Sequence, residues 1–255
     1  MDIYRDFAEV YDLFMEDAPY DEWTARICDT LKKYGITDGL IADLGCGTGA
    51  ITKRLRDAGY DMIGIDASYD MLSIAGRESD DDQSDPGSDI LYLCQDMRSF
   101  ELYGTVRAIV SVCDSINYLT EYDDLRKTFS LVNNYLDPDG LFIFDFNTIH
   151  KYRDVIGDDV IAENADDCSF IWENYYDDDT HINEYDLTLF IKEGDLFRRS
   201  TETHRQRGYT FDEMCDILTE AGLKVLYSMD ADTGKEVTQL SERVYMVARE
   251  SGKNC

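Results

Sequence analysis

A glycine-rich turn constrains the fold of this chain more than any other segment. The stretch Ile41-Ala-Asp-Leu-Gly-Cys-Gly-Thr-Gly-Ala50 ends an apolar run and then alternates Gly45, Gly47 and Gly49 with other residues. The apolar run is typical of a buried strand, and the residues after it have helical spacing, with Thr48 as the expected N-cap. Glycines let the backbone approach a ligand closely, and a helix N-terminus offers unpaired N–H groups. The segment therefore predicts a strand, a ligand-binding turn and a helix.

Short apolar runs alternate with helical segments on both sides of this turn. Helices are expected at 50–58, 69–76, 122–136 and 210–221. Strands are expected at 40–44, 61–65, 90–93, 106–112, 141–146, 223–228 and 243–249. The tetrapeptide Asp137-Pro-Asp-Gly140 predicts a turn that ends the third helix. Alternating elements with two-sided apolar strands predict an α/β fold: a doubly wound, mostly parallel, seven-stranded, Rossmann-like sheet.

Two parts of the chain depart from this alternation. Residues 3–15 and 20–34 predict two amphipathic helices at the N-terminus. After residue 150 the next crossover helix is missing, and a small antiparallel β insert is expected instead. Its predicted strands are 169–176, 182–192 and 196–207. The predicted division of the chain is an N-terminal helical cap, 1–36, a ligand-binding core, 37–149 plus 209–255, and an insert above the ligand site, 150–208.

The charge of the chain excludes some classes of partner. Asp and Glu number 54 against 24 for Lys and Arg, so the formal net charge is −30, yet 44% of the residues are hydrophobic. Such a chain is globular, and its negative surface repels nucleic-acid phosphates and anionic lipid headgroups. The cysteines include no Cys-x-x-Cys pair and the histidines lack metal-ligand spacing, so no metal site is expected. The scattered cysteines, and a sequence with neither a leader nor a long apolar span, predict a cytoplasmic location. The sequence is compatible with a monomer and with a homodimer.

Two acidic residues narrow the choice of ligand. Asp66 follows Gly45 by 21 residues, at the end of the next expected strand, where a carboxylate can bind both ribose hydroxyls of a nucleoside. Gly45-x-Gly47-x-x-Ala50 also fits a dinucleotide-binding turn, so a nicotinamide-dependent oxidoreductase is an alternative. Asp43 disfavours it, because a carboxylate just before the first glycine repels a pyrophosphate. S-adenosylmethionine, with an adenosine, an ammonium group, a sulfonium and no phosphate, suits both carboxylates.

With these residues the sequence resembles the class I S-adenosylmethionine-dependent methyltransferases over nearly its whole length. Their first motif, Asp-x-Gly-x-Gly-x-Gly, is matched by residues 43–49. Asp66-Ala67 with Met71 resembles the second motif, in which the acid holds the ribose and an apolar side chain lies against the adenine. The resemblance implies an enzyme with S-adenosylmethionine as its cofactor. Within the first motif it implies these cofactor contacts: Asp43, Gly45, Cys46, Gly47 and Gly49.

Later segments resemble further motifs of the same family. Asp96-Met97 resembles the third motif, which contacts the adenine edge, and Cys113-Asp114 matches the position between cofactor and acceptor. The N-terminal helices are similar to the cap of a bacterial small-molecule subgroup that includes aminosugar N,N-dimethyltransferases, in which cap tyrosines close over the cofactor. The tyrosines that match by position are Tyr11 and Tyr20.

The acceptor site is expected beyond the carboxyl ends of the fourth and fifth strands, where ligands bind in such sheets. Our candidates for orienting the acceptor are Asp114, Asn147 and Tyr11, and His204 in the insert is either a general base or a structural strand residue. No His or Lys occupies the expected post-strand positions, which favours a small-molecule amine over a hydroxyl, since a hydroxyl needs a base. A non-catalytic nucleoside-binding module on the same fold is the remaining alternative.

Overall fold

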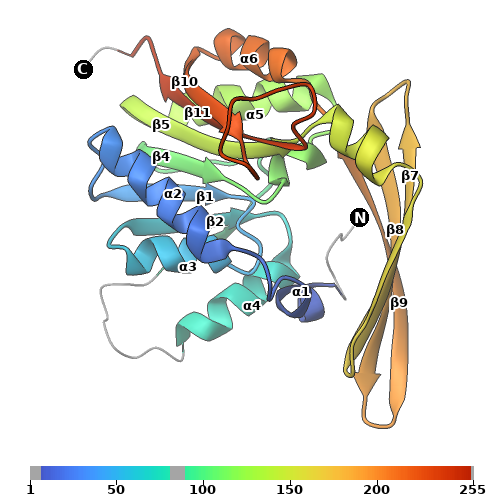
Figure 1. Cartoon of the computed structure of the whole chain (residues 1–255). Coiled ribbons are helices and arrows are strands. Elements are labelled where there is room, and N and C mark those ends of the chain that lie inside the picture. The colour runs from blue at the N-terminus through green and yellow to red at the C-terminus, as the bar shows by residue number, and fades with distance from the viewer. Residues whose placement is uncertain (1–6, 81–89, 254–255) are drawn as a thin grey trace.

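The computed structural model describes residues 7–80 and 90–253, which form two β-sheets with surrounding helices (Figure 1). The strands of the larger sheet are β1 (Leu40–Leu44), β2 (Asp61–Asp66), β3 (Leu91–Cys94), β4 (Val106–Ser111), β5 (Leu136–Asn147), β10 (Leu223–Asp230) and β11 (Arg243–Glu250). Their order is β10-β11-β5-β4-β1-β2-β3. β1 to β5 pair in parallel, and β11 runs antiparallel between β5 and β10. The predicted doubly wound, mostly parallel sheet is confirmed.

Helices cover both faces of this sheet. They are α1 (Ala8–Phe14), α2 (Tyr20–Lys33), α3 (Ala50–Asp57), α4 (Tyr69–Asp80), α5 (Tyr122–Tyr135) and α6 (Phe211–Glu220), with the short helices η1 (Ser115–Tyr118) and η2 (Lys151–Ile156). Successive strand residues point to opposite faces, so Ile41 lies in the apolar cluster that α2 and α3 complete, and Ala42 in the cluster that α5 and α6 complete. Of the helix predicted at 3–15, positions 3–6 lie outside the described residues. None of the helices within the described ranges is both long enough and apolar enough to cross a membrane.

The insert forms a separate antiparallel sheet beside the larger one (Figure 1). Its strands are β6 (Val160–Asn164), β7 (Cys168–Asp177), β8 (Ile182–Glu193) and β9 (Leu196–Arg207). One apolar side packs against α1, where the ring centroids of Phe14 and Phe170 are 4.7 Å apart. The antiparallel insert is therefore confirmed, with β6 as an additional edge strand. The predicted domain boundaries stay predictions.

One local prediction was wrong. Thr48 is not the N-cap of α3: the cap is Gly49, and Thr48 Oγ1 instead donates a hydrogen bond to Asp12 Oδ1, on α1, at 2.6 Å. The residues of the turn predicted at 137–140 lie within the bounds of β5 but do not pair with β4, because Leu136 pairs with Val106 and Leu141 with Ala108. Asp139 has a φ angle of 62°, so the chain turns there as an irregularity inside the strand.

Candidate active site

A large cavity opens beyond the carboxyl ends of β1 to β4. The chain reverses its direction across the sheet between β1 and β4, which is where open α/β sheets bind ligands. The cavity volume is about 1160 Å³. Small-ligand pockets occupy about 300–1,000 Å³, so this cavity has room for a cofactor and a second molecule. The predicted cofactor residues that line it are Tyr11, Tyr20, Asp43, Gly45, Cys46, Gly47, Asp66, Ala67, Met71, Asp96, Met97 and Cys113.

The glycine loop leaves β1 in a left-handed conformation that glycine adopts most easily. Gly45 and Gly47 have φ angles of 78° and 54°. A Cβ on Gly45 would lie 2.6 Å from Ser115 Cβ, whereas one on Gly47 would meet no atom within 4 Å. Gly49 does not line the cavity, and a Cβ there would lie 2.6 Å from the Tyr92 hydroxyl. Gly47 thus leaves backbone open to a ligand, while Gly45 and Gly49 allow close packing.

Asp43 lies beneath this loop and is almost fully buried. Thr52 Oγ1, on α3, donates a hydrogen bond to its Oδ2 at 2.6 Å. Burial raises the pKa of Asp43 to about 7, because the carboxylate loses its hydration; the Thr52 hydrogen bond opposes this rise and the charge of Asp66 adds to it. A positively charged ligand group near Asp43 would stabilise the ionised form.

Asp66 ends β2 and faces the glycine loop. Its Oδ2 accepts a hydrogen bond from the Gly47 N–H at 2.8 Å, and its Oδ1 accepts one from the Ser68 N–H at 2.8 Å. Burial raises the pKa of Asp66, and these backbone donors oppose the rise. Each carboxylate oxygen can accept a second hydrogen bond, so the two oxygens together can bind two adjacent hydroxyl groups.

Asp96 follows β3 and is held by an arginine that the sequence analysis missed. Arg98 Nη2 donates to Asp96 Oδ2 at 2.6 Å, and Arg98 Nε donates to Oδ1 at 2.9 Å. These hydrogen bonds hold the pKa of Asp96 below its usual range. Arg98 also lines the cavity, beside the apolar side chains of Met71 and Met97. The spacing Asp-x-Arg in a loop was the available indication of this ion pair.

The backbone turns sharply after β4, where Cys113 and Asp114 have φ angles of 61° and 54°. Both N–H groups donate to the Asp145 carboxylate, at 3.3 and 3.0 Å, and Arg243 Nη2 donates to the same carboxylate at 2.6 Å. Asp114 Oδ2 accepts a hydrogen bond from Gln206 Nε2 at 2.6 Å. Burial raises the pKa of the Cys113 thiol, so this cavity-lining group stays protonated. Asp145 and Arg243 therefore hold the turn that carries the cavity-lining residue Cys113.

The residues predicted to orient the acceptor are only partly brought together. Tyr11 lines the cavity, but within the described chain its lining does not include Asp114, Asn147 or His204. Asn147 Nδ2 donates to the Tyr152 hydroxyl at 2.9 Å, in the protein interior. The sequence indicated no site role for Ser115, Glu184 and Thr203, because their place in the lining depends on contacts between distant segments. Ser68, two residues after Asp66, also lines the cavity.

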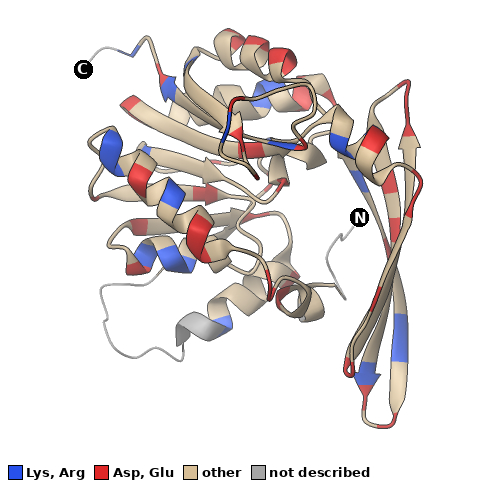
Figure 2. Ribbon diagram, in the orientation of Figure 1, with Lys and Arg blue, Asp and Glu red and all other residues tan. Residues whose placement is uncertain are grey.

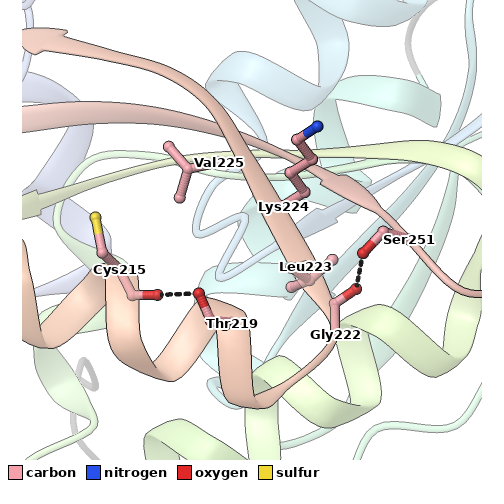
Figure 3. Close-up of a pocket in the computed structure, with 7 residues that line it drawn as sticks. All are labelled: Cys215, Thr219, Gly222, Leu223, Lys224, Val225 and Ser251. Atoms are coloured by element: carbon pink, nitrogen blue, oxygen red, sulfur yellow. Dashed lines mark hydrogen bonds between the residues drawn. The ribbon is translucent and has the colours of Figure 1, made fainter.

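A smaller depression, of about 430 Å³, lies at the other end of the sheet (Figure 3). It includes Leu223, which pairs with Glu250 at the amino ends of the parallel strands. Thr219 Oγ1 donates to the Cys215 carbonyl at 2.8 Å, and Ser251 Oγ donates to the Gly222 carbonyl at 3.0 Å. These hydroxyls therefore serve the local fold.

The cavity residues fit S-adenosylmethionine. Asp66 offers two carboxylate oxygens for ribose hydroxyls, and Asp43 offers a partly ionised carboxylate for an ammonium group. Gly47 leaves open space beside the backbone, and Met71 and Met97 supply apolar wall for an adenine ring. The donor set therefore matches a nucleoside that carries positive charge and no phosphate.

Comparisons with known proteins agree with this geometry. A family model described as a methyltransferase domain matches residues 41–140. A Bacillus subtilis (strain 168) protein named "Putative methyltransferase YqeM" is 37% identical over 98% of this chain and 98% of its own. The crystal structure of an S-adenosylmethionine-dependent methyltransferase from Clostridium acetobutylicum ATCC 824 has a TM-score of 0.87 and 29% identity, covering 98% of this chain and 99% of that one. The dTDP-3-amino-3,4,6-trideoxy-alpha-D-glucopyranose N,N-dimethyltransferase of Streptomyces venezuelae is 28% identical over 55% of this chain and 56% of its own length. The chain thus belongs to the family of S-adenosylmethionine-dependent methyltransferases.

Proposed function

We propose that this methyltransferase transfers its methyl group to the nitrogen of a small-molecule amine. The observation that carries the proposal is the chemistry of the cavity wall. Within the described residues, that wall contains no His or Lys. Burial raises the pKa of both Tyr20 and the Cys113 thiol, so neither is ionised near neutral pH. Among the described lining residues, the acceptor therefore meets no imidazole, no amine and no thiolate directly.

The absence of a strong base on the described wall separates amines from alcohols. An alcohol must lose a proton to become a good nucleophile and needs a base within hydrogen-bond reach. A neutral amine already has a free lone pair. The bound cofactor supplies an activated methyl group, so the protein mainly has to align the acceptor and exclude water. Carboxylates such as Glu184 on the cavity wall also favour entry of a positively charged amine.

The roles of the cofactor residues follow from the same contacts and are part of the proposal. Asp66 binds the ribose hydroxyls, the glycine loop supplies backbone N–H groups, and Asp43 favours the ammonium group. Asp96 and Met97 contact the adenine. Tyr11 and Tyr20 close the cavity from the cap. The adjoining volume beside Tyr118, Thr203 and Arg205 takes the acceptor.

The Streptomyces relative supports an amine acceptor, because its name describes dimethylation of an amino group on a sugar nucleotide. Arg205 on the cavity wall forms an exposed ion pair with Glu184 at 3.2 Å, and its guanidinium would suit a phosphate of such a molecule. The negative charge of the chain opposes a nucleic-acid acceptor.

The proposal is tested by methyl transfer from isotopically labelled S-adenosylmethionine to matched pairs of acceptors. Each pair consists of an amine and the same molecule with a hydroxyl in its place, and aminosugar nucleotides form one group of pairs. We expect transfer only to amines, and an Asp66→Ala variant should lose cofactor binding in calorimetry. Transfer to the hydroxyl member alone would contradict the amine assignment. Cofactor binding without transfer to any acceptor would favour the non-catalytic alternative.

A further inference from the structure

A buried histidine lies directly behind a tyrosine of the cavity wall. Tyr118, at the end of η1, lines the cavity, and its hydroxyl oxygen lies 3.1 Å from His204 Nδ1 on β9. The same hydroxyl lies 3.1 Å from the hydroxyl of Tyr185 on β8. His204 itself is fully buried and outside the cavity lining. A route of hydrogen bonds thus leads from the cavity to an imidazole that an acceptor cannot touch.

The second nitrogen of this imidazole faces a carboxylate. His204 Nε2 lies 3.5 Å from Glu202 Oε2, and the Glu202 side chain is only 10% exposed. A carboxylate beside Nε2 favours the tautomer with the proton on that nitrogen. Nδ1 then presents a lone pair and accepts the hydrogen bond of Tyr118. The Tyr185 ring is stacked on the imidazole, with centroids 4.8 Å apart and an interplanar angle of 8°, which fixes its orientation.

We propose that Tyr118, His204 and Glu202 form a proton relay that removes the proton of the amine acceptor during methyl transfer. This inference rests on the proposed function. Tyr118 is the catalytic residue that touches the acceptor, while His204 and Glu202 act through it. The imidazole does not line the cavity, so the proton of the acceptor reaches it only through the Tyr118 hydroxyl. A neutral amine attacks with its own lone pair, so the relay has to take a proton only as the N–C bond forms.

Methyl transfer forms one bond, breaks one bond and moves one proton. The acceptor nitrogen uses its lone pair to form the N–C bond, and the S–C bond breaks with its electron pair passing to sulfur. The N–H proton passes to Tyr118 Oη, which gives its own proton to His204 Nδ1. The resulting imidazolium is stabilised by Glu202. After product release, the proton returns through Tyr118 to water.

Nuclear magnetic resonance can test the relay without a known acceptor. The chain has three histidines, so the ¹⁵N signals of labelled histidine are few enough to assign. We expect His204 to carry its proton on Nε2 and to accept a hydrogen bond at Nδ1. Tyr118→Phe should move the Nδ1 signal toward that of a free lone pair. A proton on Nδ1 in the unaltered protein, or an Nδ1 signal unchanged in Tyr118→Phe, would overturn the relay.

A second tyrosine–histidine pair supplies a matched control. The Tyr176 hydroxyl lies 3.1 Å from His181 Nδ1, and neither residue lines the cavity. With an amine from the acceptor screen, Tyr118→Phe should lower kcat by about 100-fold with little change in KM, a typical loss for a proton-transfer group. Tyr176→Phe should leave kcat unchanged. Equal rates for the two variants would contradict the relay.

The pH profile distinguishes a relay from a merely structural role. The described titratable groups that face His204 are Tyr118 from η1, Tyr185 from β8 and Glu202 from β9, while Asp114 acts on Tyr185. In Glu202→Gln the imidazolium loses its anionic neighbour, so the acid limb of the kcat profile should move to lower pH. A limb that does not move would contradict the relay. If no amine is methylated, the proposed function fails instead, and the histidine spectra still report on the hydrogen-bonded chain.

Discussion

At the scale of single residues, burial and hydrogen bonding compete at the carboxylates of the cofactor site. Asp43 receives one hydroxyl donor and Asp66 receives two backbone donors, and burial raises the pKa of both. Two buried carboxylates near the same loop cost free energy in the unliganded protein. A ligand with a positive charge would remove part of this cost, so the same two carboxylates would lower the stability of the unliganded protein and favour binding of a cationic ligand.

The pH dependence of stability should reveal Asp43. Its pKa is about 7 in the folded protein and about 3.9 in an unfolded chain. The folded state therefore holds this proton more tightly, so stability falls as pH rises from about 4 to about 7, by at most about 4 kcal/mol. Urea unfolding at pH 5 and pH 8 should show a smaller difference for Asp43→Asn than for the unaltered protein. Asp61→Asn, at an exposed position, is the control; the same difference in all three proteins would refute this origin.

Gly45 should tolerate no larger residue. A Cβ at this position would lie 2.6 Å from Ser115 Cβ and Oγ, on a backbone with φ of 78°. Steric overlap and left-handed strain together should cost Gly45→Ala about 2–4 kcal/mol and abolish cofactor binding. Gly76, on α4, is the matched control, since a Cβ there meets nothing within 4 Å. Gly76→Ala should instead stabilise the protein by about 0.5–1 kcal/mol, and equal unfolding midpoints would contradict the argument.

At the scale of helices and strands, local patterns predicted most of the elements but not the contacts between them. Apolar periodicity identified the strands of the large sheet and the three long strands of the insert. It missed β6, because all five of its residues are exposed and carry no apolar alternation. The local pattern also predicted Thr48 as a helix cap, which was wrong because its hydroxyl donates a hydrogen bond to Asp12 on α1. Tyr118 and His204 are 86 residues apart, so only the packing of η1 against β9 shows their contact.

The ion pair between Asp145 on β5 and Arg243 on β11 should stabilise the turn after β4. Asp145 accepts the N–H groups of Cys113 and Asp114 and is paired with Arg243, and both paired side chains are largely buried. Arg243→Met leaves a buried carboxylate unpaired, which should cost about 3–5 kcal/mol in urea unfolding. Combining it with Asp145→Asn should cost less than the sum of the two single changes.

Arg107 provides the comparison for this pair. It forms an exposed ion pair with Asp38 at 3.6 Å, and such pairs contribute little to stability. Arg107→Met should therefore cause a much smaller loss than Arg243→Met. Similar losses for the two arginine variants would show that the buried pair does not hold the turn.

At the scale of the whole molecule, the cavity is lined by residues from the N-terminal helices, from the loops of the large sheet and from the insert. Acidic residues lie on the large sheet, on its helices and in the insert (Figure 2). Helix α1 contacts both the glycine loop of the large sheet and the insert. On one side Asp12 binds Thr48 of the glycine loop, and on the other Phe14 packs against Phe170 of the insert. Tyr11, on the same helix, lines the cavity.

This arrangement predicts that contacts with the insert influence cofactor affinity. Phe14→Ala removes an edge-to-face contact at 4.7 Å from Phe170, and such pairs contribute about 0.5–1.5 kcal/mol beyond their buried area. If α1 transmits this loss to Tyr11 and Thr48, calorimetry should show a dissociation constant for S-adenosylmethionine raised by about three- to tenfold. Hydrogen exchange of α1 should become faster in the same variant. Phe197→Ala, at a half-exposed position on the β8–β9 hairpin, should change neither. An unchanged affinity in Phe14→Ala would show that the cap holds the cofactor without support from the insert.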